Sequence, residues 1–345
     1  MAESVPPAPD LLQALLRDVS RSFYTTLRVL PSSVRRPIGL AYLLARATDT
    51  IADTEIIPVA DRLRALDQLR SRILGRSRER LDFTAFTRGD RRAAFPGSTA
   101  SERRLLERIE EALTVLSSFT PEDQRHIRTV LATIASGQEL DLRKFATDAE
   151  GFTQVRALET DAELDDYTYR VAGCVGEFWT AMCRAHVFPQ ARLDDEKMLA
   201  NAVRFGKGLQ LVNILRDLPA DLRKGRCYLP QESLHPTGLV PKDLLEPKNE
   251  TRLRPAYDRW LDRADGHLRA GWAYTNSLPW DCVRVRLACA WPILIGAKTV
   301  EALRAGPVLD ASQRIYLIEK GVVRHPAAAA ALRAEQAPIH QYMGV

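Results

Sequence analysis

The sequence predicts an all-α protein that forms a single domain over its 345 residues. Apolar residues recur at spacings of three and four along most of the chain, the period of an amphipathic helix. Alternating polar and apolar runs long enough for strands are missing from the sequence. Pro and Gly gather at residues 86–100 and 229–243, which we interpret as loops.

Helical periodicity locates the individual elements in order. Helices are expected at residues 34–53, 58–75, 100–118, 158–184, 194–218, 250–277 and 281–304. A further helix should begin after Thr120, a favoured N-cap, with Pro121 in the first helical position. Residues 1–10 are expected to be disordered.

Composition limits the class of protein. Apolar residues make up 46% and charged residues 27%, which is ordinary for a globular chain. The net charge of +5 would help to attract an anionic substrate or membrane surface. Basic runs such as residues 69–80 are interpreted as solvated helix faces, since no aromatic residues interleave with them as nucleic-acid binding would require.

Cysteines and terminal sequence point to a cytoplasmic protein. The five cysteines form neither a C-x-x-C motif nor a zinc-binding spacing, so we expect them to be reduced. The N-terminus lacks the features of a signal peptide. The apolar run at residues 287–297 is shorter than the roughly 20 residues that span a bilayer, which leaves peripheral contact with a membrane as the alternative.

Two carboxylates on one predicted helix raise the question of what lies between them. Asp49 and Asp53 stand four residues apart, so on a helix they share one face about 6 Å apart. Like charges at that spacing repel by a few tenths of a kcal/mol. A solvent-facing acidic helix end would explain this cluster taken alone.

A second acidic cluster favours a metal site. Asp217 and Asp221 are again four apart, and each cluster has an arginine beside it, Arg46 and Arg216. Four carboxylates facing one interior would need cations. Mg²⁺ is the natural one, because it takes one or two carboxylates per ion and completes its shell with water and substrate phosphates. The arginines would then hold phosphate oxygens.

Four motifs in this order resemble the squalene/phytoene synthase family of head-to-head prenyl synthases. They are "SRSFYTTLRVLP" (20–31), "YLLARATDTIAD" (42–53), "DYTYRVAGCVGE" (166–177) and "GLQLVNILRDLPADLRKGRCYLP" (208–230). The resemblance extends over roughly residues 15–323. It implies an isoprenoid synthase helical bundle with a central apolar cavity, in which carbocations are protected from water.

The resemblance also implies roles for individual residues. The Mg²⁺–diphosphate cage would comprise Asp49, Asp53, Asp217 and Asp221, with Asn213 as a further ligand and Gln210 nearby. Contacts to diphosphate would come from Ser20, Arg21, Ser22, Tyr42, Arg46, Arg216 and Tyr228, and walls of the prenyl channel from Phe23, Val171 and Val175. Tyr167 would handle a proton or stabilise a cation, the alternative being a core tyrosine with a satisfied hydroxyl. Mn²⁺ is the alternative metal.

One residue departs from the family pattern. Where the family commonly has R-D-V-x-E-D, this chain has R-D-L-P-A-D. Pro219 cannot donate to the carbonyl four residues back, so the helix is expected to end or kink there. Asp217 is therefore the better-supported metal ligand and Asp221 the weaker one.

Further segments resemble squalene synthases in particular. They are residues 285–303 and "EKGVVR" (319–324), whose Lys320 and Arg324 are candidates to bind NADPH, with a solvated basic turn as the alternative. The expected function is condensation of two farnesyl diphosphates through presqualene diphosphate and reduction to squalene. A non-reducing enzyme that makes dehydrosqualene, phytoene or hydroxysqualene is the alternative within the family. A non-catalytic helical scaffold is the alternative outside it. The oligomeric state is not predicted.

Overall fold

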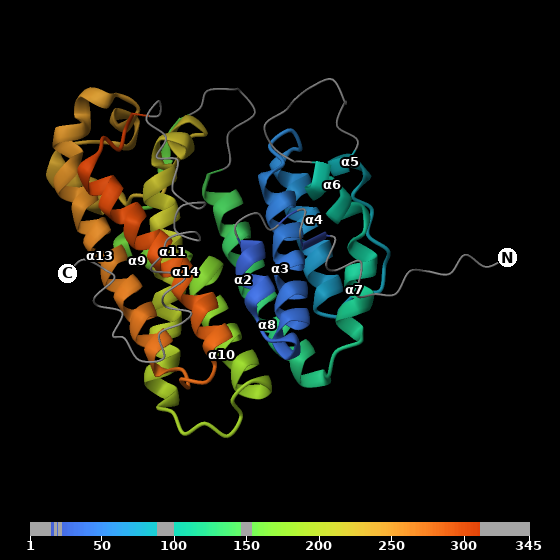
Figure 1. Cartoon of the computed structure of the whole chain (residues 1–345). Coiled ribbons are helices and arrows are strands. Elements are labelled where there is room, and N and C mark those ends of the chain that lie inside the picture. The colour runs from blue at the N-terminus through green and yellow to red at the C-terminus, as the bar shows by residue number, and fades with distance from the viewer. Residues whose placement is uncertain (1–14, 17–18, 20–22, 88–99, 146–153, 311–345) are drawn as a thin grey trace. The chain divides into compact units, whose positions relative to one another are not determined.

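We describe the fold from a computed structural model of the chain. The structure describes residues 15–16, 19, 23–87, 100–145 and 154–310, so the segment 1–10 lies outside the described residues. The described residues belong to two compact units (Figure 1). Unit 1 contains Met1–Arg143 and Ala181–Pro189, and unit 2 contains Lys144–Thr180 and Gln190–Val345. Helices dominate both, which confirms the all-α prediction.

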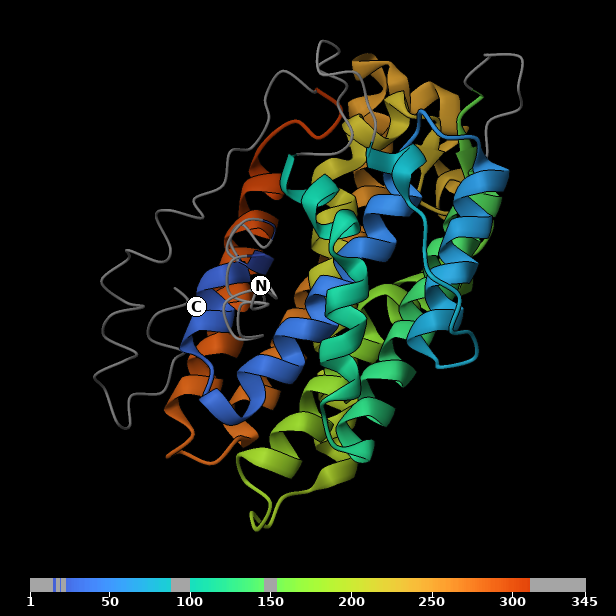
Figure 2. The ribbon, with the colours of Figure 1, turned by 90° about the vertical axis from the view of Figure 1, so that its right-hand side faces the viewer.

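Unit 1 is organised around the long helix α3 (Ser32–Asp53). Its buried residues Leu40, Leu44 and Ile51 follow the helical spacing that predicted it. Helices α4, α6 and α7 pack against α3, and Figure 2 shows α6 and α7 beside it. The other helices of this unit are α2 (Phe23–Val29), α4 (Val59–Ile73), α5 (Thr84–Thr87), α6 (Ala100–Glu107), α7 (Ile109–Ser117) and α8 (Pro121–Lys144), which continues one residue into unit 2.

Two local predictions in unit 1 have different outcomes. The Thr120 hydroxyl accepts a hydrogen bond from the Asp123 backbone N–H at 3.2 Å, which confirms the predicted N-cap of α8. The single helix predicted at 100–118 is instead two helices, because the backbone leaves helical geometry at Arg108 (φ −106°, ψ 17°). Leu105 and Ile109 are buried on either side of this break, so the apolar period continues across it and conceals it.

Unit 2 is built on three long helices. Helix α11 (Asp195–Arg223) packs along α13 (Glu250–Ser277), and both contact α14 (Val283–Ala305), as Figure 1 shows. The predicted 194–218, 250–277 and 281–304 helices correspond to these three. The remaining elements are α9 (Asp161–Thr168), α10 (Cys174–His186, shared with unit 1 from Ala181), α12 (Gln231–Leu234) and the short helices η2 (His235–Thr237), η3 (Pro241–Leu245) and η4 (Pro247–Asn249).

The helix predicted at 158–184 contains a widened turn. Between α9 and α10 the chain forms a π-helix, η1 (Tyr169–Gly173), a feature often found at functional sites. Here the backbones of η1, α10 and α11 approach closely. A Cβ added at Gly206 would lie 2.2 Å from the Ala172 carbonyl oxygen, and one at Gly176 would lie 2.1 Å from that of Ala202. Glycine is therefore required at both positions.

Helix α11 does not end at Pro219, which was one of the two outcomes expected from the sequence, the other being a kink. It continues to Arg223, with the proline inside it. Proline removes one helical hydrogen bond, the one to the Leu215 carbonyl. The hydroxyl of Tyr257 on α13 donates a hydrogen bond to that carbonyl instead, at 2.9 Å. A side chain from another helix thus supplies the donor that the local sequence lacks.

A short parallel pairing is the exception to the prediction that strands are missing. Strand β1 (Arg156–Ala157) pairs with β2 (Arg226–Cys227), and Arg156 is the partner of Arg226. Two residues per strand produce too little alternation to be read from sequence. The pairing holds the segment after α11 beside the segment before α9.

The apolar run at 287–297 lies within α14. Its buried residues include Leu287, Ile293 and Gly296, and a Cβ at Gly296 would lie 3.1 Å from Leu268 of α13. In the described part of the chain, no helix is both long and apolar enough to cross a membrane. The run is explained by helix packing within unit 2.

Candidate active site

The first acidic cluster lies on α3 and includes a buried residue from another helix. The guanidinium of Arg46 donates hydrogen bonds to Asp49, three residues later, and to Glu102 of α6. Glu102 is only 5% exposed, so its charge requires a partner such as Arg46. Asp53 follows Asp49 by one turn of the same helix, as predicted.

This crowding of carboxylates alters the protonation of Asp49. Burial and the neighbouring charges of Asp53 and Glu102 together raise the pKa of Asp49 to about 7, against the lowering effect of Arg46. Arg46 therefore only partly offsets the burial of the Asp49 carboxyl and the negative charges beside it. An added cation would stabilise the ionised form. A divalent metal with oxygen ligands fits this donor set.

The remaining predicted residues of the N-terminal motifs are only partly described. Tyr42 lies one turn before Arg46 on α3, and its hydroxyl donates to the Val19 carbonyl at 3.4 Å. Phe23 begins α2. Ser20, Arg21 and Ser22 lie outside the described residues.

The second acidic cluster lies on α11. Because the helix continues through Pro219, residues 210, 213, 217 and 221 follow each other at spacings of three or four and occupy one face. These are Gln210, Asn213, Asp217 and Asp221, all half-buried. Asp221 therefore keeps the helical spacing to Asp217 that the proline had placed in doubt.

Arg216 contacts Asp217 through two donors on one edge of its guanidinium. Its Nε donates to Oδ1 of Asp217 at 2.9 Å and its Nη2 donates to Oδ2 at 2.6 Å. This bidentate geometry is the one in which a guanidinium also binds phosphate. A diphosphate would therefore compete with the Asp217 carboxylate for Arg216, while a metal ion would take over the carboxylate.

Tyr167 and Tyr228 form an aromatic stack in unit 2. Their ring centroids are 5.1 Å apart and their planes differ by 22°. Phe145 packs edge-on against Tyr228, with centroids also 5.1 Å apart. Both tyrosines are buried. The two predicted residues that come from distant motifs are thus brought together.

The predicted wall residues Val171 and Val175 lie one turn apart across the π-helix. Val171 belongs to η1 and is half-buried, and Val175 begins the next turn with 36% of its surface exposed. An exposed valine on this segment is compatible with a lining position, which stays a prediction.

The two acidic pairs predicted to bind metal belong to different units, Asp49 and Asp53 to unit 1 and Asp217 and Asp221 to unit 2. Among the described residues, no group of three or more His, Cys, Asp and Glu side chains is arranged to hold a metal ion. Pairs of carboxylates are the usual protein contribution to Mg²⁺, which takes its other ligands from water and phosphate. The donor sets therefore fit Mg²⁺, and the assembled four-carboxylate cage stays a prediction.

One residue of the first cluster was missed by the sequence analysis. Glu102 lies 56 positions from Arg46 and carries no motif of its own. Its signal is weak, because an acid within the first turn of a helix is ordinary. Only packing of α6 against α3 identifies it.

Comparison with known proteins agrees with these features. The model of the squalene/phytoene synthase family matches residues 16–318, which include both acidic clusters and the segment around Tyr167. The chain belongs to the squalene/phytoene synthase family. The match ends before Lys320 and Arg324, and both residues also lie outside the described part of the structure.

Relatives within the squalene/phytoene synthase family carry names of both branches. A phytoene synthase of Rhodobacter capsulatus is 28% identical over 85% of this chain and 73% of its own. A squalene synthase of Saccharomyces cerevisiae is 29% identical over 68% of this chain and 48% of its own. The chain spans 43% of a bifunctional lycopene cyclase/phytoene synthase of Blakeslea trispora, at 27% identity over 82% of this chain.

Solved structures of the squalene/phytoene synthase family share the fold. A complex of TcSQS with the ligand E5700 has a TM-score of 0.72 at 22% identity, covering 94% of this chain and 85% of that one. A dehydrosqualene synthase complex has a TM-score of 0.61 at 20% identity, covering 97% and 96%. These similarities confirm the all-α isoprenoid synthase fold.

Proposed function

We propose that the protein is a head-to-head prenyl synthase that joins two farnesyl diphosphates to presqualene diphosphate and reduces this intermediate to squalene with NADPH. The main support for the condensation step is the pair of acidic clusters, each with an adjacent arginine. Family membership supports Mg²⁺ as the metal. The proposal of NADPH-dependent reduction rests on the resemblance of the C-terminal segments to squalene synthases.

The cluster residues suit the ionisation of an allylic diphosphate. Mg²⁺, when bound, supplies Lewis-acid stabilisation of the departing diphosphate. Asp49, Asp53, Asp217 and Asp221, with Asn213, would hold the metal ions. Arg46 and Arg216 would bind diphosphate oxygens, the latter after exchanging its bidentate contact with Asp217.

Tyr167 is suited to the carbocation stage of the reaction. One face of its ring stacks on Tyr228, and both rings are buried, so water has little access to them. Aromatic faces stabilise a cation by roughly 0.5–2 kcal/mol each. The stack therefore supports a role for Tyr167 in holding positive charge or receiving a proton.

Product analysis is the decisive experiment for this proposal. The purified protein is incubated with Mg²⁺ and farnesyl or geranylgeranyl diphosphate, with and without NADPH. We expect presqualene diphosphate to accumulate from farnesyl diphosphate without NADPH, and squalene to form when it is added. A C30 product spectrum that is indifferent to NADPH would contradict the reductive step and favour dehydrosqualene or hydroxysqualene.

Phytoene synthesis is the second candidate function, because several relatives carry that name. Condensation of geranylgeranyl diphosphate in preference to farnesyl diphosphate would support it. Failure to release diphosphate from either substrate in the presence of Mg²⁺ would instead support a non-catalytic scaffold.

The proposed NADPH contacts have their own test. Lys320 and Arg324 would meet the phosphates of the cofactor. Replacing both with Ala should raise the apparent KM for NADPH and leave presqualene diphosphate formation unchanged. An unaltered KM would mean that these residues form only a solvated basic turn.

A further inference from the structure

The Leu215 carbonyl is a weak point of α11. Residue 219, four positions later, is the proline, which has no N–H to donate and whose ring crowds that carbonyl. Leu215 is 1% exposed, so water is a poor substitute as donor. A buried backbone carbonyl without a partner destabilises the element that carries it.

Tyr257 supplies the missing donor from α13. Its hydroxyl donates to the Leu215 carbonyl at 2.9 Å, and the side chain is fully buried. Burial also raises the pKa of Tyr257, so the phenol keeps its proton across the physiological range. The hydrogen bond therefore does not depend on ionisation of the tyrosine.

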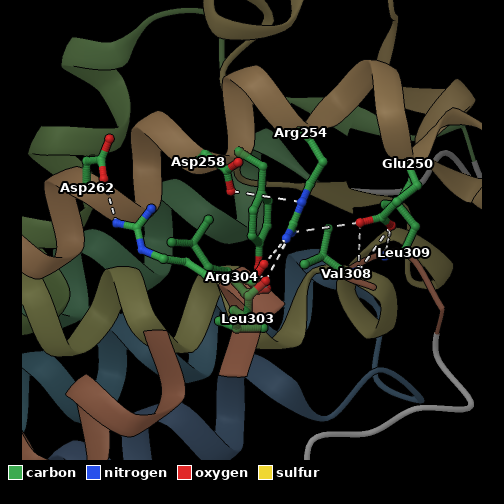
Figure 3. Close-up of polar contacts among 10 residues, drawn as sticks. Glu250, Arg254, Asp258, Asp262, Leu303, Arg304, Val308 and Leu309 are labelled. Atoms are coloured by element: carbon green, nitrogen blue, oxygen red, sulfur yellow. Dashed lines mark hydrogen bonds and ion pairs between the residues drawn. The ribbon is translucent and has the colours of Figure 1, made fainter. Parts of the chain in front are cut away.

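Arg254, three residues before Tyr257 on α13, lies over the tyrosine ring and contacts the end of α14. The Arg254 guanidinium carbon lies 5.9 Å from the centre of the Tyr257 ring. Arg254 also donates to the carbonyls of Leu303, at 3.0 Å, and Arg304 at the end of α14, as Figure 3 shows. One turn earlier, Glu250 accepts the backbone N–H of Val308 at 3.1 Å. These contacts attach α13 to the end of α14.

The interaction lies within the second acidic cluster. Asp217 is two residues before Pro219 and Asp221 is two residues after it. We propose that Tyr257 is a positioning residue, which keeps α11 helical through Pro219 and so holds the two carboxylates on one face. This inference deepens the proposed function, since it rests on Asp217 and Asp221 binding metal-complexed diphosphate.

A double-mutant cycle tests the proposal directly. Tyr257→Phe removes the hydroxyl, and Pro219→Ala restores a backbone N–H that can donate to Leu215. The readout is calorimetric binding of Mg²⁺ in the presence of inorganic diphosphate, which does not depend on turnover. We expect Tyr257→Phe to weaken Mg²⁺ binding about tenfold, equivalent to about 1.4 kcal/mol. In the Pro219→Ala background the same change should alter binding less than about twofold.

Tyr274→Phe is the matched control. Tyr274 lies on the same helix and is 1% exposed, and its hydroxyl accepts a hydrogen bond from the Thr180 hydroxyl at 3.0 Å. This variant should lower the melting temperature, leave Mg²⁺ binding unchanged, and gain nothing from Pro219→Ala.

The other possible results of the double-mutant cycle each support or overturn the positioning role of Tyr257. If Tyr257→Phe loses stability but binds Mg²⁺ normally, Tyr257 has a purely structural role and the proposal is overturned. The proposal is also overturned if Tyr257→Phe weakens Mg²⁺ binding tenfold and Pro219→Ala does not restore it. If Tyr257→Phe fails to fold, a folded Pro219→Ala/Tyr257→Phe protein with normal Mg²⁺ binding supports the proposal, and an unfolded one contradicts it. Failure of the proposed function would appear separately, as normal Mg²⁺–diphosphate binding without any prenyl product.

Discussion

Tyr228 stacks on Tyr167 with the two ring centroids 5.1 Å apart. Tyr167 is carried by α9, whereas Tyr228 follows strand β2, so the contact joins two motifs 61 positions apart in the chain (228 − 167). Tyr228 was predicted to contact diphosphate, but its ring is 7% exposed and also packs against Phe145. The ring of Tyr228 therefore packs against Tyr167, and the diphosphate contact of its hydroxyl stays a prediction.

Substitutions at Tyr228 separate the ring from the hydroxyl. Tyr228→Phe keeps the stack and should retain most of the stability. Tyr228→Ala should lower the free energy of unfolding by about 3–5 kcal/mol, the usual cost of removing a buried aromatic ring. Denaturant unfolding measures both. A Phe variant that keeps its stability but loses affinity for farnesyl diphosphate would identify the hydroxyl as the predicted diphosphate contact.

Asp49→Ala and Asp217→Ala should each abolish turnover and leave the fold intact. Each removes a proposed metal ligand, and the first also removes the charge repulsion of Asp49 with Asp53 and Glu102. Asp67→Ala is the control, since Asp67 is 63% exposed and pairs only locally with Arg70. If a variant keeps more than about a tenth of the wild-type rate at saturating Mg²⁺, the altered residue is not an essential ligand. Such a rate corresponds to a change of less than about 1.4 kcal/mol in the activation barrier.

Glu102→Gln should destabilise unit 1. The buried carboxylate accepts a hydrogen bond from Arg46, and a neutral amide leaves that guanidinium with less compensation. Loss of a charged partner in a buried pair costs about 1–3 kcal/mol. Thermal and denaturant unfolding would measure this loss of stability, with Glu122→Gln at an exposed position of α8 as the control. Equal stability of the two variants would indicate that Glu102 is not needed to hold Arg46.

The stability of unit 2 should depend on pH through His267. Burial and the positive charges of Arg204, Arg263 and Lys207 together lower the pKa of His267 to about 4. Its Nδ1 also accepts a hydrogen bond from Arg204 at 3.4 Å, which requires the unprotonated atom.

The direction of this dependence follows from linkage. The unfolded histidine, with its ordinary pKa of 6.5, binds a proton more readily than the folded one. The contribution to stability is therefore present above pH 6.5 and is lost as the pH falls toward about 4. His267→Gln should flatten the unfolding free energy over this interval. If the free energy of unfolding changes with pH equally in the wild type and the variant, His267 does not titrate as described.

Sequence periodicity predicted the long helices because burial of one face imposes a local repeat. The bounds of α13, for example, agree with the predicted helix, and α3 begins at Ser32 rather than at residue 34. The break at Arg108 was not predictable, since Leu105 and Ile109 keep the same buried face on both sides of it.

By itself, the sequence determined the helical class and the two acidic clusters with their arginines, because these depend on short spacings within single helices. Tertiary structure decided what no local pattern contains. The buried Glu102 reaches Arg46, Tyr228 stacks on Tyr167, and the Tyr257 hydroxyl replaces the hydrogen bond that Pro219 removes from α11. A proline predicts the loss of a backbone donor, but only the packing of α13 on α11 provides another, and that packing is why the helix continues through the second cluster.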